Sequence, residues 1–127
     1  MTHRRPHCIL LALAALSLIA IAIGSLLPVL PDPLQRATLA IGNQHLIAYL
    51  VAAYLLGLGL EAGLRGTVVV IAALACYGGA IELLQALVPG RAGAMEDFWM
   101  NTAGATLGGA AAWFTLLGRR VWLRAGP

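Results

Sequence analysis

The sequence predicts an all-α fold, namely an integral membrane bundle of four transmembrane helices with the N and C termini in the cytoplasm. Three observations lead to this prediction. The 127 residues are 61% hydrophobic and only 10% charged, whereas a soluble domain carries about 25% charged residues. Four apolar runs approach the roughly 20 residues that cross a hydrocarbon core of about 30 Å. The eight basic residues flank these runs and do not gather on one face, which argues against a nucleic-acid surface.

The first apolar run covers residues 8–27, contains no charged residue and ends at Pro28, where a proline-rich segment indicates a turn. A cleaved signal peptide is the alternative, because Arg4 precedes the run and residues 20–22 resemble a cleavage site. The run is longer than the apolar core of a signal peptide, which has about 7–15 residues. Three further runs also follow it, so we favour a membrane span.

The other three runs are separated by glycine, proline and charged residues. The second run covers residues 44–60 and is the shortest of the four. The third covers residues 67–88 and stops at the Pro89–Gly90 pair, which indicates a turn. The fourth covers residues 98–117 and is closed by Gly118 and two arginines. The sequence therefore predicts spans of unequal length joined by short connections.

The arginines predict the orientation of these spans. With both termini inside, the cytoplasmic segments hold Arg4, Arg5, Arg65, Arg119, Arg120 and Arg124, and the outer segments hold only Arg36 and Arg91. An excess of basic residues in the cytoplasmic segments is the pattern that sets orientation in membrane proteins. Four spans also require both chain ends on one side of the membrane.

Polar residues of three runs fall at one predicted level. In this orientation the start of the second run, the end of the third and the start of the fourth all lie at the outer face. These places hold His45 and Tyr49, Glu82 and Gln85, and Asp97 and Asn101. The members of each pair are three or four residues apart and share a helix face. We expect one polar cluster at the outer level and nothing comparable in the cytoplasmic half.

Glycines continue two of these polar faces toward the middle of the membrane. Gly78 lies four residues before Glu82, and Gly104 and Gly108 continue the polar face of the fourth run. Small residues at this spacing let membrane helices approach closely. We expect these three glycines to pack helices together and to turn the polar residues toward the bundle interior.

Glu82 is the most informative of the polar residues. It lies roughly 10 Å below the predicted span end at Pro89, where an ionised carboxylate costs on the order of 2.5–3.5 kcal/mol. The carboxyl group therefore needs a proton, water or a partner, and Arg91, His45 and Asn101 are predicted on the same side. Two interpretations remain open, a hydrogen bond that holds helices together and a proton-linked or ligand-contacting acid.

The neighbouring residues also have two interpretations each. Asp97 either binds a ligand or, like Glu96, stabilises the positive end of a helix in its first turn. His45 and Tyr49 are either interfacial residues or ligand contacts. Arg91 is either a counter-charge to the carboxylates or a group that binds a phosphate or carboxylate. No metal and no cofactor is expected, because the sequence has no ligand spacing such as HExxH.

The spacing of these residues resembles that of the VanZ-like family, small bacterial membrane proteins named for a teicoplanin-resistance determinant. The pattern H-x3-Y is HLIAY at residues 45–49, and E-x2-Q-x5-R-x5-D-x3-N-x2-G-x3-G is ELLQALVPGRAGAMEDFWMNTAGATLGG at residues 82–109. The resemblance covers about residues 28–117. One departure is the segment GNQ at residues 42–44, where family members often carry Asp-Lys.

The resemblance implies a multi-pass protein of the bacterial cytoplasmic (inner) membrane, with residues 1–127 as a single domain. It also implies that the motif positions form a functional site. The motif positions are His45, Tyr49, Glu82, Gln85, Arg91, Asp97, Asn101, Gly104 and Gly108.

We expect the polar cluster to bind an anionic envelope component, such as a lipid-linked precursor, or a glycopeptide. Arg91 would engage the anion, while Glu82, Asp97 and Asn101 would orient it. Membrane lipids are expected partners, nucleic acid is not, and the sequence is compatible with an oligomer. The resemblance adds a link to teicoplanin tolerance in some family members.

Two other classes of function stay open. A membrane-embedded enzyme would use Glu82 and Asp97 as catalytic acid and base on an envelope lipid or peptide. A small proton-coupled exporter would use the buried Glu82, but the sequence shows no polar relay that continues to the cytoplasm. We therefore favour a binding protein over an enzyme, and an enzyme over an exporter.

Overall fold

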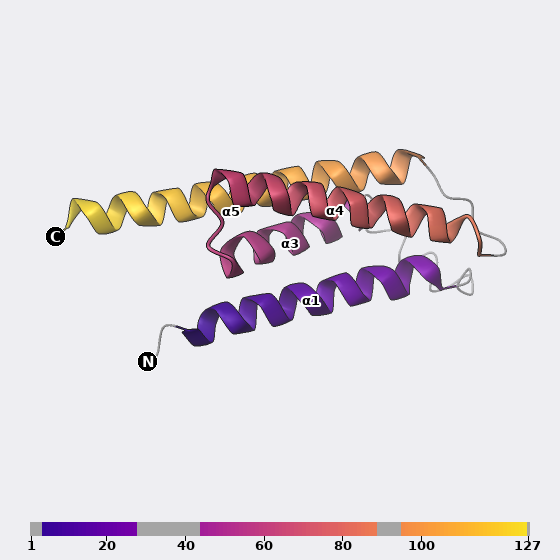
Figure 1. Ribbon diagram of the computed structural model, residues 1–127, viewed down its shortest axis with the longest axis horizontal. Helices are drawn as coiled ribbons and strands as arrows, with labels where there is room; N and C mark the ends of the chain where they lie inside the picture. The colour runs from indigo at the N-terminus through magenta and orange to yellow at the C-terminus, as the bar shows by residue number, and fades with distance from the viewer. Residues whose placement is uncertain (1–3, 28–43, 89–94, 127) are drawn as a thin grey trace.

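The structure, a computed structural model, describes residues 4–27, 44–88 and 95–126. Within these residues the fold is all-α and has four helices, which are α1 (Arg4–Leu26), α3 (Gln44–Gly59), α4 (Leu64–Gln85) and α5 (Met95–Ala125). Each helix overlaps one predicted run, so the all-α four-helix prediction is confirmed. The helices alternate in direction, and α1 begins where α5 ends, at one end of the bundle (Figure 1).

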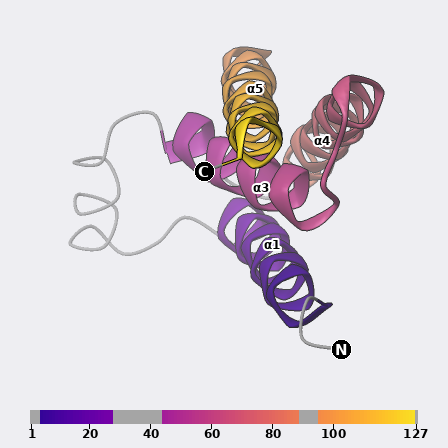
Figure 2. The ribbon, with the colours of Figure 1, turned by 90° about the vertical axis from the view of Figure 1, so that its left-hand side faces the viewer.

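α3 lies at the centre of the bundle. In an end-on view, α1 and α5 lie on opposite sides of α3, and α4 lies beside it (Figure 2). The packing between α3 and α5 is the most extensive, followed by α4 against α5 and α1 against α3. The core therefore lies between α3, α4 and α5, where its buried members are Tyr49, Ala53, Val70, Leu74 and Ala105.

Two glycines of α5 set its distance from α3. A Cβ atom added at Gly104 would overlap the carbonyl oxygen of Leu46, and one added at Gly108 would overlap that of Leu50. The two backbones are thus in direct contact, an approach that small residues allow in membrane helices. Because Asn101 lies one turn before Gly104, the same contact brings the Asn101 side chain against the start of α3.

Two side chains of α4 hold α1 against the bundle. The Tyr77 hydroxyl donates to the carbonyl oxygen of Leu18 at 2.7 Å, and the Gln85 amide donates to that of Ser25 at 2.8 Å. Ser25 lies in the last turn of α1, where carbonyl groups have no partner within the helix. We expected Gln85 in the ligand-binding cluster. Its amide group instead donates a hydrogen bond to a carbonyl group at the end of α1.

The surface of the bundle is apolar and its interior holds polar side chains. The exposed large apolar residues of α1 are Ile9, Leu13, Leu16, Ile19 and Ile23, and those of α4 are Leu64, Val68, Val69, Leu83 and Leu84. The buried polar residues are Ser25, Thr67, Glu82, Gln85 and Asn101. Exposed apolar surface of this extent is unfavourable in water and favourable in contact with lipid. The distribution supports a membrane location.

Two of the described helices are long and apolar enough to cross a membrane, one at Pro6–Leu26 and one at Leu64–Gln85. α3 is also apolar but has only 16 residues. The predicted arrangement of four spans with both termini in the cytoplasm stays a prediction.

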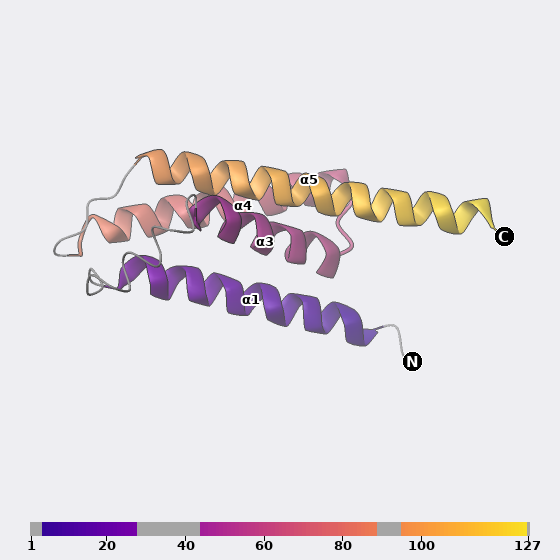
Figure 3. The ribbon, with the colours of Figure 1, turned by 180° about the vertical axis from the view of Figure 1, so that it is seen from behind.

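α5 is longer than the predicted fourth span. We expected this run to close at Gly118 and the arginines behind it, but the helix begins at Met95 and continues to Ala125. One glycine costs a helix only about 1 kcal/mol relative to alanine, and the leucines and arginines around Gly118 are good helix formers. The last residues of α5 project past the other three helices (Figure 3).

Candidate functional site

His45 of α3 and two residues of α5 meet at the end of the bundle where α5 begins. His45 Nδ1 lies 3.2 Å from Asn101 Oδ1, and His45 Nε2 lies 3.9 Å from Asp97 Oδ2. An amide oxygen can only accept, so Nδ1 is the donor of the first contact. Asp97 and Asn101 are four residues apart on one face of α5, and the imidazole lies between them.

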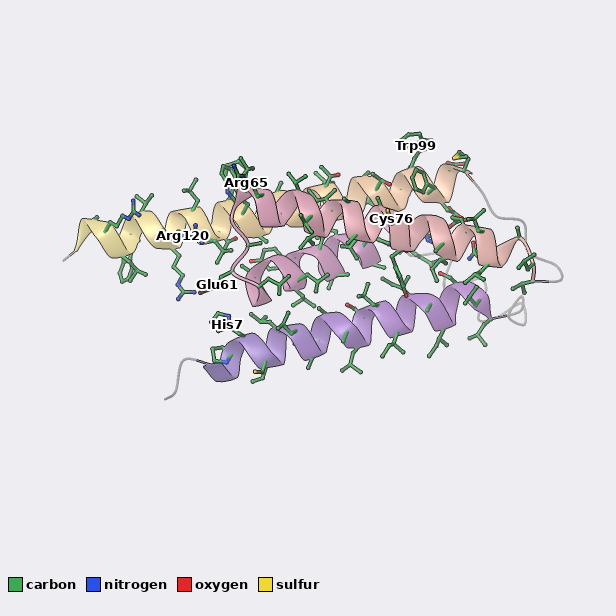
Figure 4. All side chains as sticks on the ribbon, viewed as in Figure 1. His7, Glu61, Arg65, Cys76, Trp99 and Arg120 are labelled. Atoms are coloured by element: carbon green, nitrogen blue, oxygen red, sulfur yellow. The ribbon has the colours of Figure 1, made fainter. Side chains whose placement is uncertain are left out.

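His45 and Asp97 form the open side of this group. The His45 side chain is 28% exposed and that of Asp97 is 38% exposed. Asp97 lies in the first turn of α5, where a carboxylate interacts favourably with the helix dipole. The separation of 3.9 Å is too long for a hydrogen bond, so both groups keep capacity for another molecule. Trp99 lies at the same end of the bundle and points away from it (Figure 4).

Asn101 and Tyr49 form the closed side of the group. Both side chains are fully buried, and both lie against Gly78 of α4. A Cβ atom at Gly78 would lie 3.1 Å from Asn101 Nδ2 and 3.2 Å from Tyr49 Oη. Glycine at this position therefore lets three helices bring two polar atoms together.

Neither of these two atoms has a hydrogen-bond partner among the residues that the structure describes. A buried polar group without a partner costs about 1–3 kcal/mol, and such groups in native proteins usually have a functional explanation or an ordered water. The Asn101 amide nitrogen is a donor only, and the Tyr49 hydroxyl can donate. The pair is therefore complementary to an oxygen acceptor.

Glu82 completes the group from α4. It is 9% exposed, lies one helical turn after Gly78, and interacts electrostatically with the Tyr49 hydroxyl. We name His45, Tyr49, Glu82, Asp97 and Asn101 the polar site.

The polar site contains five of the seven side chains that we expected to bind a ligand. Gln85 is bonded to α1, and Arg91 lies outside the described residues. Within the described ranges, no three His, Cys, Asp or Glu side chains gather in a way that could hold a metal ion.

A second group of charged residues lies at the opposite end of the bundle. Glu61 Oε1 is 3.7 Å from His7 Nε2 and 3.5 Å from Arg119 Nη1, and Arg120 donates to the Glu61 carbonyl oxygen at 3.4 Å. Figure 4 shows His7, Glu61 and Arg120 side by side between α1 and α5. These contacts connect the turn between α3 and α4 to α1 through His7 and to α5 through Arg119 and Arg120.

Glu61 adopts a left-handed backbone conformation, with φ at 47°. A helix commonly ends on this conformation, but glycine is the usual residue there. We missed this charged group because we searched for polar residues inside the apolar runs, and Glu61 lies between two of them. The sequence did contain a signal for this group, because Glu61 is an acidic residue at the end of the bundle that is otherwise rich in arginine.

Comparison with known protein families gives a match over most of the chain. The family model described as VanZ/LLP1 matches residues 17–117, which include part of α1 and all of α3 and α4. No curated protein and no solved structure matches the chain.

Proposed function

The chain belongs to the VanZ/LLP1 family, and from this premise we propose that it binds an anionic component of the bacterial cell envelope at the polar site. The observation that carries the proposal is the buried pair of Tyr49 Oη and Asn101 Nδ2, which have no acceptor among the described residues. The phosphate oxygens of a lipid-linked precursor supply such acceptors. Hydrogen bonds to a charged group contribute about 1.5–3 kcal/mol each.

The proposal gives the residues of the open side different roles. The ligand enters beside His45 and Asp97, the two partly exposed members. Asn101 holds one nitrogen of the imidazole, and Asp97 lies 3.9 Å from the other nitrogen. Arg91 is proposed as the main cation, because its fork of donors suits a phosphate.

Two tyrosines offer a matched test of the proposal. Tyr49→Phe removes a buried hydroxyl that has no partner among the described residues, so we expect an unchanged or slightly higher melting temperature. The same change should weaken binding of a polyprenyl diphosphate about tenfold, because it removes one hydrogen bond to the ligand. Tyr77→Phe removes the bond to Leu18, and should cost about 1 kcal/mol of stability while leaving binding unchanged.

The measurements are melting curves and ligand titrations on the purified full-length protein in detergent. Equal binding by wild type and Tyr49→Phe would count against the polar site as the ligand site. Weaker binding by both variants would show that the loss follows general destabilisation instead of the missing hydroxyl.

The second candidate function is catalysis by the two carboxyl groups of the polar site. The observation that favours it is the difference between their surroundings, since Glu82 is buried and Asp97 is partly exposed. Carboxyl groups in unlike surroundings can act as acid and base in one reaction.

Glu82→Gln separates catalysis from binding, because glutamine keeps much of the hydrogen bonding but transfers no proton. Under the binding proposal, the variant should still bind a polyprenyl diphosphate and the wild type should release no phosphate from it. Phosphate release by wild type that stops in Glu82→Gln would favour the enzyme instead. Phosphate release that continues in Glu82→Gln would exclude an acid–base role for Glu82.

A further inference from the structure

The last part of α5, residues 117–125, differs from the rest of the bundle in its surroundings. α5 has 31 residues and is about 46 Å long, well beyond the roughly 30 Å of a hydrocarbon core. The last residues of α5 project past the other helices (Figure 1), and residues 117–125 are exposed throughout. We name these residues the α5 extension.

The α5 extension is rich in arginine and apolar residues at once. It carries Arg119, Arg120 and Arg124, and between them lie Val121, Trp122 and Leu123, which are 60%, 75% and 60% exposed. Arginine beside an exposed tryptophan is typical of the level where a membrane meets water. A segment with this composition fits a surface that is apolar on one side and anionic on the other.

Two of the arginines carry a guanidinium charge that no described carboxylate neutralises. Glu61 lies beside Arg119 and His7, and no ion pair is formed by Arg120 or Arg124 with a described carboxylate. Arg120 makes a long bond of 3.4 Å to the backbone oxygen of Glu61 and points from α5 toward His7 and Glu61 (Figure 4). Arg120 and Arg124 are four residues apart and therefore share one face of the helix.

We propose that the α5 extension binds the phosphate groups of anionic phospholipids through Arg120 and Arg124, with Trp122 at the same level of the membrane. Guanidinium groups bind phosphate oxygens with two parallel hydrogen bonds. Basic residues next to a membrane helix are attracted to anionic lipid surfaces. The proposal concerns the end of the bundle opposite the polar site and does not depend on the function proposed above.

The test titrates the purified full-length protein in a neutral detergent with phosphatidylglycerol, phosphatidylcholine or inorganic phosphate. The shift of the melting temperature reports binding. We expect phosphatidylglycerol to raise the melting temperature of the wild type, and phosphatidylcholine and inorganic phosphate to leave it nearly unchanged. Arg124→Gln should weaken binding of phosphatidylglycerol about fivefold, and the Arg120→Gln/Arg124→Gln double variant about thirtyfold.

The Arg120→Lys/Arg124→Lys double variant is the control for charge, and should bind phosphatidylglycerol within a few fold of the wild type. The proposal would be overturned if the Arg120→Gln/Arg124→Gln double variant bound phosphatidylglycerol as tightly as the wild type. Both double variants change only exposed side chains. Equal effects of phosphatidylglycerol and phosphatidylcholine would also overturn it. Full competition by millimolar inorganic phosphate would show a site for free anions instead of a lipid site.

Discussion

Gly108→Ala is expected to lower the stability of the bundle by about 3 kcal/mol, because the new methyl group would overlap the carbonyl oxygen of Leu50. Gly104→Ala is expected to have a similar effect through Leu46. In both cases the obstacle is backbone, which cannot turn aside as a flexible side chain can. The helices must separate, and the melting temperature of the purified protein measures the loss.

Gly118→Ala is the matched control, since it lies on the same helix and a Cβ atom there meets nothing within 4 Å. That variant should be neutral or more stable by up to about 1 kcal/mol, because alanine is the better helix former. Gly79→Ala is a second control, as its nearest contact would be an ordinary 3.5 Å from Phe98. A Gly108→Ala protein that melts like the wild type would contradict the close contact between α3 and α5.

Asn101→Leu is expected to weaken ligand binding strongly while retaining the fold. Leucine has the branched shape of asparagine but removes the bond to His45 and the donor that faces Gly78. Loss of one hydrogen bond to an anionic ligand weakens binding by about tenfold to a hundredfold. We expect this loss for a polyprenyl diphosphate, and the inhibitory concentration of teicoplanin in a glycopeptide-susceptible host tests the link to tolerance that the family resemblance implies.

Thr106→Val is the control for Asn101→Leu, because Thr106 is exposed and its hydroxyl donates to the carbonyl oxygen of Thr102 on the same helix. Both variants should be compared at equal amounts in the membrane, with vancomycin as a second drug. Unchanged ligand binding by Asn101→Leu would assign the polar site to helix packing. If Asn101→Leu reduces lipid binding but leaves drug tolerance unchanged, the polar site binds lipid and does not contribute to drug tolerance.

The number and order of the helices could be predicted from the sequence because long apolar runs leave few alternatives. The grouping of His45, Asp97 and Asn101 could also be predicted, since helix periodicity placed Asp97 and Asn101 on one face. The end of α5 could not, because apolar length marks where a membrane ends and not where hydrogen bonding within the helix stops.

The partners inside the polar site were beyond prediction for a different reason. Gln85 lies three residues from Glu82 on the same helix face. Gln85 nevertheless bonds to Ser25 of α1, whereas Glu82 interacts with Tyr49 of α3. Which neighbour a polar side chain meets depends on how the helices are rotated against each other, and glycine contacts set that rotation. The carbonyl group of Ser25 has no signature in the sequence at all.

Under the predicted arrangement of four spans, the short length of α3 has a consequence for the surrounding bilayer. Its 16 residues span about 24 Å, against about 33 Å for the 22 residues of α4. A helix shorter than the hydrocarbon thickness is accommodated by local thinning of the bilayer. His45 stands at one end of α3 and Glu61 just beyond the other, so thinning would draw water and headgroups toward both. Lipids with long acyl chains resist this thinning and should therefore lower the stability of the native bundle.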